Sequence, residues 1–110
     1  MPRSKNALLS LLTLAAACGV NVSSPNQPTG TITFELDAQT CPPGEVSIDM
    51  LVDGVFESRE AFSPGTLRSI EASVGTHIAS AVITDTTSGF AQASVVVPKF
   101  GDVTYLMVCR

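Results

Sequence analysis

The sequence lacks tryptophan and is poor in aromatic, histidine and basic residues. Its 110 residues, enough for one domain, include five Phe, one Tyr, one His and six Lys or Arg. A sugar platform or a single-stranded nucleic-acid surface needs exposed rings, so the scarcity of rings argues against both. Ten acidic residues give a formal net charge of −4, and an acidic surface repels a phosphate backbone. We therefore expect no nucleic-acid partner.

The chain also lacks an apolar run long enough to span a membrane as a helix. Arg3 and Lys5 precede an apolar stretch over residues 7–17. As a helix this stretch covers about 16 Å, against a hydrocarbon core of about 30 Å. A short positive region followed by such a stretch is typical of a secretory signal peptide. We therefore expect residues 1–17 to be a signal helix that is removed.

The run Leu14-Ala15-Ala16-Ala17-Cys18 resembles the lipobox of bacterial lipoproteins. In that family the cysteine thiol receives a diacylglyceryl group and a peptidase cuts just before it. The resemblance implies that Cys18 becomes a lipidated first residue, held by acyl chains in the bacterial cell envelope. By the same resemblance, Gly19 implies the outer membrane. The alternative is a freely secreted protein in which Cys18 has no role.

Residues 19–30 have the composition of a flexible linker. The run GVNVSSPNQPTG is rich in Pro, Gly, Ser and Asn and has no periodicity. We therefore divide the chain into a signal peptide (1–17), a lipidated cysteine with its linker (18–30) and a domain (31–110). Without the signal peptide, four basic and ten acidic residues remain, a net charge of −6.

The three cysteines leave an even pair once Cys18 is assigned to lipid. An exported protein occupies an oxidising compartment, so we expect a disulfide between Cys41 and Cys109. Two free thiols or a metal pair are the alternatives. The single His and the lack of a CxxC motif argue against a metal site, and no cofactor is expected.

From residue 31 onward the pattern predicts short strands separated by Pro, Gly and Asp turns, with no helical periodicity. Such spacing favours an all-β fold, a single antiparallel β-sandwich. The last three strands contain apolar runs on both faces, which predicts central positions in the sheets. The expected strands cover residues 31–37, 45–52, 55–62, 66–74, 78–85, 90–97 and 103–109.

The expected disulfide constrains the topology. Cys41 follows the first strand and Cys109 ends the last one. Bridged cysteines need Cα atoms within about 7 Å. The two strands should therefore run parallel side by side, or face each other across the sandwich with their ends aligned.

Three runs together resemble the small bacterial β-sandwich modules typified by the PEGA domain: PGEVSIDMLVDG, FSPGTLRSIEASVGTHIASAVI and SVVVPKFGDVTYLMV. Val52-Asp53-Gly54 matches their hairpin, and Gly75-Thr76-His77 matches the step into the next strand. Immunoglobulin-like and transthyretin-like sandwiches are equally open. The resemblance implies scaffolding or interaction, with no shared catalytic residues.

Two groups of residues are weighed for catalysis. His77 has Ser73, Ser80 and Asp85 nearby in sequence, but no G-x-S-x-G elbow is present. A second group of acids surrounds one hairpin and could form a carboxylate pair or a calcium site: Asp49, Asp53, Glu57 and Glu60. Arg59 between these acids favours a solvated, charged strand edge instead.

We therefore expect a non-enzymatic structural or binding module, attached to a membrane through Cys18. Its partner would be an envelope protein or a surface ligand, bound at loop tips or at a strand edge. The alternative is a secreted hydrolase, or a protease inhibitor that uses residues 63–66. The candidate loop-tip residues are Asp53, Gly54, Pro64, Gly65, Thr87 and Ser88.

Overall fold

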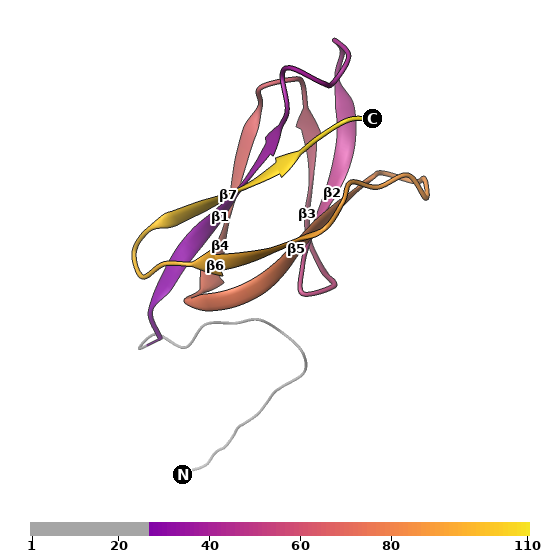
Figure 1. Ribbon diagram of the computed structural model, residues 1–110. Helices are drawn as coiled ribbons and strands as arrows, with labels where there is room; N and C mark the ends of the chain where they lie inside the picture. Colours follow the sequence, from indigo (N-terminus) through magenta and orange to yellow (C-terminus); the bar gives the residue numbers. More distant parts are fainter. Residues whose placement is uncertain (1–26) are drawn as a thin grey trace.

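The computed structural model describes residues 27–110, and these form a two-layer β-sandwich (Figure 1). The predicted signal peptide, Cys18 and most of the linker lie outside the described residues. No helix within residues 27–110 is long and apolar enough to cross a membrane. The seven strands are β1 (Thr29–Leu36), β2 (Val46–Val52), β3 (Val55–Phe62), β4 (Leu67–Ser73), β5 (Gly75–Ile83), β6 (Ala93–Val97) and β7 (Asp102–Met107).

One sheet has the strand order β4-β1-β7 and the other has β3-β2-β5-β6. All pairings are antiparallel except that of β1 with β7, which is parallel. The all-β sandwich is therefore confirmed. The expected disulfide allowed two arrangements of the first and last strands, and the structure has the one in which they run parallel side by side.

The core lies between the two sheets and follows the alternation of the strands. In β1, Ile32, Phe34 and Leu36 are buried while the intervening residues face outward. Ile48, Met50 and Val52 of β2 face them from the opposite sheet. The Phe34 and Tyr105 rings meet edge to face, with centroids 5.2 Å apart, a favourable geometry for aromatic pairs.

The strand boundaries differ from those expected at several places. β1 begins at Thr29, two residues inside the expected linker, and β5 begins at Gly75, where a turn was expected. Val74 alone connects β4 to β5 and carries the chain from one sheet to the other. A single-residue connection suffices because Gly75 has φ +127°, which glycine adopts at little cost.

The prediction that the last strands occupy central positions is wrong for β6 and β7. Of the last three strands, β5 alone is internal, whereas β6 and β7 are edge strands. Their outward side chains Val96 and Leu106 are exposed. A short apolar run does not distinguish a strand covered on both faces from an edge strand that exposes apolar groups.

The sandwich has two ends that differ in content. The hairpin end contains the start of β1, the Asp53–Gly54 turn, Val74 and the arch of residues 98–101 between β6 and β7 (lower part of Figure 1). The disulfide end contains Cys41, Cys109, the turn of residues 63–66 and the loop of residues 84–92. The chain therefore enters the sandwich at the end opposite to the disulfide.

Candidate functional site

Cys41 and Cys109 form a disulfide, with Cα atoms 5.0 Å apart. The parallel register of β1 and β7 brings the two cysteines together, because Leu36 lies opposite Met107 where both strands end. The backbone N–H of Asp37 donates to the Met107 carbonyl at 2.9 Å and continues this pairing one step further. The expected disulfide is therefore confirmed.

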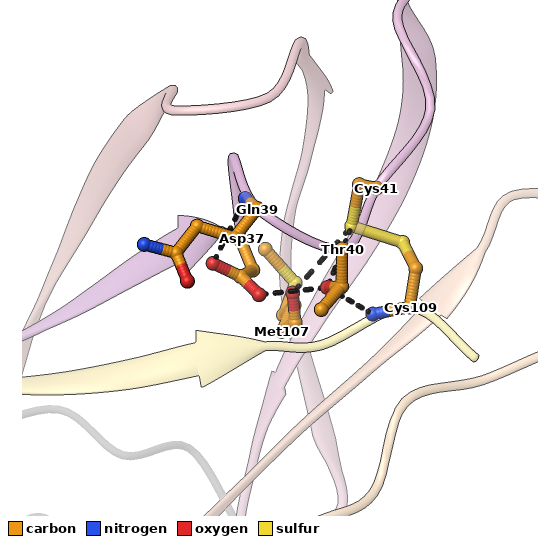
Figure 2. Close-up of a disulfide and its surroundings, with 6 residues drawn as sticks. All are labelled: Asp37, Gln39, Thr40, Cys41, Met107 and Cys109. Carbon is orange, nitrogen blue, oxygen red and sulfur yellow. Dashed lines mark hydrogen bonds between the residues drawn. A yellow bond between two sulfur atoms is a disulfide. The ribbon is translucent and has the colours of Figure 1, made fainter.

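Thr40 links the two sides of the disulfide without being part of it (Figure 2). Its hydroxyl donates to Asp37 Oδ2 at 2.7 Å and accepts from the Cys109 backbone N–H at 3.0 Å. The other Asp37 oxygen accepts from the Gln39 backbone N–H at 3.3 Å. These bonds satisfy polar groups in a segment that has no strand partner. Hydrogen bonds therefore hold the loop over residues 37–41 in addition to the disulfide.

Two adjacent hollows open beside the disulfide. The smaller, of about 280 Å³, is mainly apolar and is lined by Leu36, Pro42, Pro43 and Val46. The larger, of about 670 Å³, is lined by Ser88, Gly89, Ala91, Val108 and Arg110. Ile83, Phe90 and Cys109 line both. Together these hollows, called the disulfide-end cleft below, form a concave surface that is apolar in the smaller hollow and mixed in the larger, with Glu45 and Arg110 among its lining residues.

The wall of the disulfide-end cleft is fixed by a buried tyrosine. The Tyr105 hydroxyl donates to the Ala91 carbonyl at 2.8 Å. The Phe90 backbone N–H donates to the Ala81 carbonyl at 2.9 Å, so the segment is held on both sides. Burial raises the pKa of Tyr105 to about 12, because the phenolate would lose its hydration. The loop therefore presents a preformed surface to the cleft.

His77 forms a hydrogen-bonded group with Asp53 and Ser73 at the hairpin end. Its Nδ1 lies 2.7 Å from Asp53 Oδ2, and its Nε2 lies 2.8 Å from the Ser73 carbonyl and 3.2 Å from Ser73 Oγ. The other Asp53 oxygen accepts from the Ile78 backbone N–H at 2.8 Å. The His77 side chain is only 12% exposed. The order of residues is that of a Ser-His-Asp relay, so the direction of each hydrogen bond decides its chemistry.

The protonated form of His77 satisfies both contacts. A carbonyl and a carboxylate accept, so a ring with hydrogen on both Nε2 and Nδ1 can donate to each of them. Burial on its own would lower the pKa of His77, but the hydrogen bonds to Asp53 and Ser73 and the Asp53 charge outweigh it and raise this pKa. In its protonated form the ring cannot take the proton of a serine hydroxyl, which a general base must do. The group therefore ties the β2–β3 hairpin to the end of β4.

The hairpin acids do not converge on one point. Asp49 pairs with Arg59 across the β2–β3 ladder, and the Arg59 Nε to Asp49 Oδ1 distance is 2.7 Å. This hydrogen bond lowers the pKa of Asp49. Glu60 accepts from Ser58 and lies 3.8 Å from Arg68. Neighbouring strand residues face opposite sides of a sheet, so the pleat separates Arg59 from Glu60.

Within residues 27–110, no group of three or more His, Cys, Asp or Glu side chains could hold a metal ion. The structure distributes the predicted loop-tip residues over both ends. Asp53 and Gly54 lie at the hairpin end, and both Asp53 oxygens have hydrogen-bond partners inside the protein. The others lie at the disulfide end, and among them Ser88 lines the disulfide-end cleft: Pro64, Gly65, Thr87 and Ser88.

The turn of residues 63–66 is held against the end of β1. The Gly65 backbone N–H donates to the Leu36 carbonyl at 2.7 Å, and the Leu36 N–H donates to the Thr66 carbonyl at 3.2 Å. Thr66 also accepts through its hydroxyl from the Ser63 N–H at 3.0 Å. A protease inhibitor presents a rigid loop that projects from its body. In this turn, Gly65 and Thr66 are bonded to Leu36 at the end of β1, so the turn lies against the sandwich.

Sequence reasoning found Ser88 of the disulfide-end cleft but missed Phe90, and it missed Thr40 beside the disulfide. Phe90 was expected to begin the strand over residues 90–97, but β6 begins only at Ala93, and Phe90 packs against the core from the loop before it. Thr40 had a readable signal, because an Asp followed by polar residues at the next positions often forms a local side-chain turn.

Comparison with protein-family models, with curated proteins and with solved structures found no match to this chain.

Proposed function

We propose that this chain is a lipid-anchored protein of the bacterial cell envelope whose sandwich is a non-catalytic binding module. One observation carries the proposal: the chain enters the sandwich at the hairpin end, and the disulfide-end cleft opens at the opposite end. Lipid on Cys18 would therefore hold the hairpin end toward the membrane. The cleft would face away from it, where a partner can reach.

The chemistry of the cleft indicates the kind of partner. Leu36, Val46, Ile83 and Phe90 offer apolar contact, and burial of apolar area is the main favourable term in such binding. Arg110 and Glu45 on its lining offer charge of both signs. We propose that the cleft accepts an apolar side chain of another envelope protein. The resemblance to bacterial interaction modules supports this proposal.

Intact mass tests the anchor. Protein extracted from membranes of a bacterial host is expected to begin at Cys18 and to carry acyl chains. Its mass should rise by two hydrogens on reduction, because the Cys41–Cys109 bridge opens. The Cys18→Ser variant should appear in the soluble fraction. An unmodified wild type in the soluble fraction would contradict the anchor.

Site-specific crosslinking tests the binding surface. A photoreactive residue in place of Ser88, which lines the disulfide-end cleft, is expected to capture an envelope protein in intact cells. The matched control replaces Ser94, an exposed serine of β6 outside the cleft. Capture from the Ser88 position alone supports the proposal. Equal capture from both positions, or from neither, would contradict it.

A further inference from the structure

We propose that the hairpin end is a second membrane contact, in which Phe100 and its apolar neighbours enter the headgroup region of a zwitterionic bilayer. The inference rests on the proposed lipidation of Cys18, and it assigns a role to surface residues that the anchor does not require. It concerns the end of the sandwich opposite to the disulfide-end cleft.

Exposed apolar residues are concentrated at this end. Nine large hydrophobic residues of the described chain are exposed, and six of them lie on or beside the turns of the hairpin end. Only Leu67, Leu106 and Val108 do not. A local excess of exposed apolar groups marks an interaction surface. The six are Val55, Phe56, Val74, Ile78, Val96 and Phe100.

Phe100 is the most exposed of these residues, at 82%. It has φ +55°, a left-handed conformation that is costly for a bulky residue. Strain of this kind persists only where the surroundings enforce it. Here the Phe100 backbone N–H donates to the Thr29 carbonyl at 2.9 Å, and the Thr31 N–H donates to the Gly101 carbonyl at 2.9 Å. The arch therefore holds the ring in solvent.

The same hydrogen bonds place Phe100 where the chain enters the domain. Val74 is bonded there too, because its backbone N–H donates to the Pro28 carbonyl at 3.3 Å. Gly30 permits the close packing of the arch, since a Cβ at this position would lie 2.2 Å from the Pro98 carbonyl oxygen. Backbone hydrogen bonds thus join both Phe100 and Val74 to the residues at the start of β1.

The bilayer is the occupant that this position favours. Pro28 lies ten positions after Cys18, and ten steps of extended chain span at most about 35 Å. A lipidated Cys18 therefore keeps the hairpin end within reach of the membrane surface at all times. Lys99 Nζ lies 5.4 Å from the centre of the Phe100 ring. A lysine beside an aromatic ring suits the headgroup region, where the charge meets phosphate and the ring meets acyl chains.

The charged residues at the hairpin end favour one class of lipid over another. Lys99 is accompanied by Glu57, Glu71 and Asp102, and Asp53 is paired with His77. An excess of carboxylates disfavours an anionic surface. The contact is therefore to zwitterionic phospholipid, through apolar insertion and not through charge attraction.

The absence of native tryptophan provides a clean test. Full-length protein carrying Phe100→Trp is processed in cells, and its mass is checked for acylation at Cys18. It is then reconstituted into phosphatidylethanolamine and phosphatidylcholine vesicles whose acyl chains are brominated. The tryptophan emission is expected to shift to shorter wavelength and to be quenched. Phe56→Trp, an aromatic exchange at a second exposed tip, should respond in the same way.

The control is Leu67→Trp, an exposed position of β4 next to the disulfide end. Its emission should be neither shifted nor quenched. Acylated protein whose Phe100→Trp emission is unquenched would overturn the inference and leave the anchor intact. An emission shift that depends on protein density and not on bromine would indicate a second copy of the chain as the occupant and would also overturn it. Stronger quenching with phosphatidylglycerol would contradict the assigned lipid class.

Discussion

The two ends of the sandwich are closed by different chemistry. At the disulfide end two of the three connections are long, with residues 37–45 between β1 and β2 and residues 84–92 between β5 and β6. A covalent bond and the Thr40 hydroxyl join the first connection to the chain after β7, and the Tyr105 hydroxyl joins the second to β7. At the hairpin end the connections are short, and backbone hydrogen bonds with one ion pair hold them.

This difference follows from the entropy of closing loops. A long connection loses more conformational freedom on ordering than a short one, and at the disulfide end a covalent bond and side-chain hydrogen bonds offset this loss. Short turns order at little cost, which leaves the side chains of the hairpin end free to point into solvent. The rigid cleft and the apolar tips therefore lie at opposite ends for a physical reason.

Removing the disulfide should have the largest effect on the difference between the two ends. The Cys41→Ser, Cys109→Ser double variant is expected to lose about 4 kcal/mol of the free energy of unfolding, because the bridge closes a loop of 68 positions. Urea unfolding measures the loss. Hydrogen exchange should show earlier opening over residues 37–45 than at the Asp53–Gly54 turn. A double variant as stable as the wild type would mean that the loops at this end need no covalent tie.

Gly30→Ala tests the backbone packing of the hairpin end. The added methyl group would lie 2.2 Å from the Pro98 carbonyl and 2.8 Å from the Gly101 carbonyl, so the arch must move. Overpacking of this kind should cost about 2 kcal/mol of stability, measured by urea unfolding.

The matched control for Gly30→Ala is Gly54→Asn, at the turn of the same end. Gly54 has φ +78° and open space around it, and asparagine tolerates that conformation. Its stability should stay close to that of the wild type. If Gly30→Ala were equally neutral, the arch would not be a rigid part of this end.

The sequence predicted the parts of the fold that depend on alternation and covalent chemistry. The alternation of apolar and polar residues predicted β1 and β2, and the structure buries Ile32 and Phe34 on one face of β1 and Ile48 and Met50 on one face of β2. The pairing of Cys41 with Cys109 limited β1 and β7 to two arrangements, one of which is observed. Local pattern and bond geometry carry such information without knowledge of the rest of the chain.

The parts that the sequence did not predict depend on long-range placement. Val96 and Leu106 continue apolar runs, yet they face solvent because β6 and β7 are edge strands. His77 was expected in a turn, but it lies in β5, and its carboxylate partner is Asp53, 24 positions away. Only the folded arrangement of strands decides which distant residues meet.

Tyr105→Phe tests the two ends separately, because it should loosen only the wall of the disulfide-end cleft. The ring stays buried against Phe34, but the hydrogen bond to the Ala91 carbonyl is lost. We expect a loss of about 1 kcal/mol, with faster exchange of the Phe90 amide and no change at the hairpin end. Equal exchange at Phe90 in both proteins would show that the tyrosine does not hold the loop.

The same tyrosine gives a pH signal, since it is the only one in the chain. The pKa of Tyr105 is raised to about 12 in the folded protein, against an ordinary value of 10.0. The neutral form is thus favoured by folding, and this contribution to stability is present below pH 10 and is lost as the pH rises toward 12. Absorbance of the phenolate should appear near pH 12. Its appearance near pH 10 without unfolding would contradict the buried position.

The smallest expected effect concerns His77 at the hairpin end. Burial alone would lower the pKa of His77, but Asp53 and the Ser73 carbonyl raise it above 6.5. Burial alone would raise the pKa of Asp53, but the Ile78 amide and His77 lower it below 3.8. The contribution of the His77–Asp53 pair to stability is therefore fully present between pH 3.8 and pH 6.5. Stability should fall as the pH rises above 6.5 through the folded pKa of His77, and also below pH 3.8.

Asp53→Asn isolates this contribution. Asparagine keeps an oxygen for the Ile78 N–H and tolerates the φ of +54° at this position, so the turn should survive while the charge is removed. Because Asp53 is partly exposed, the loss should be no more than about 1 kcal/mol. Urea unfolding of both proteins from pH 5 to pH 9 measures it. The wild type should lose stability over this range and the variant should lose less. Parallel curves would mean that backbone bonds alone hold the hairpin end, and its contrast with the disulfide end would then be complete.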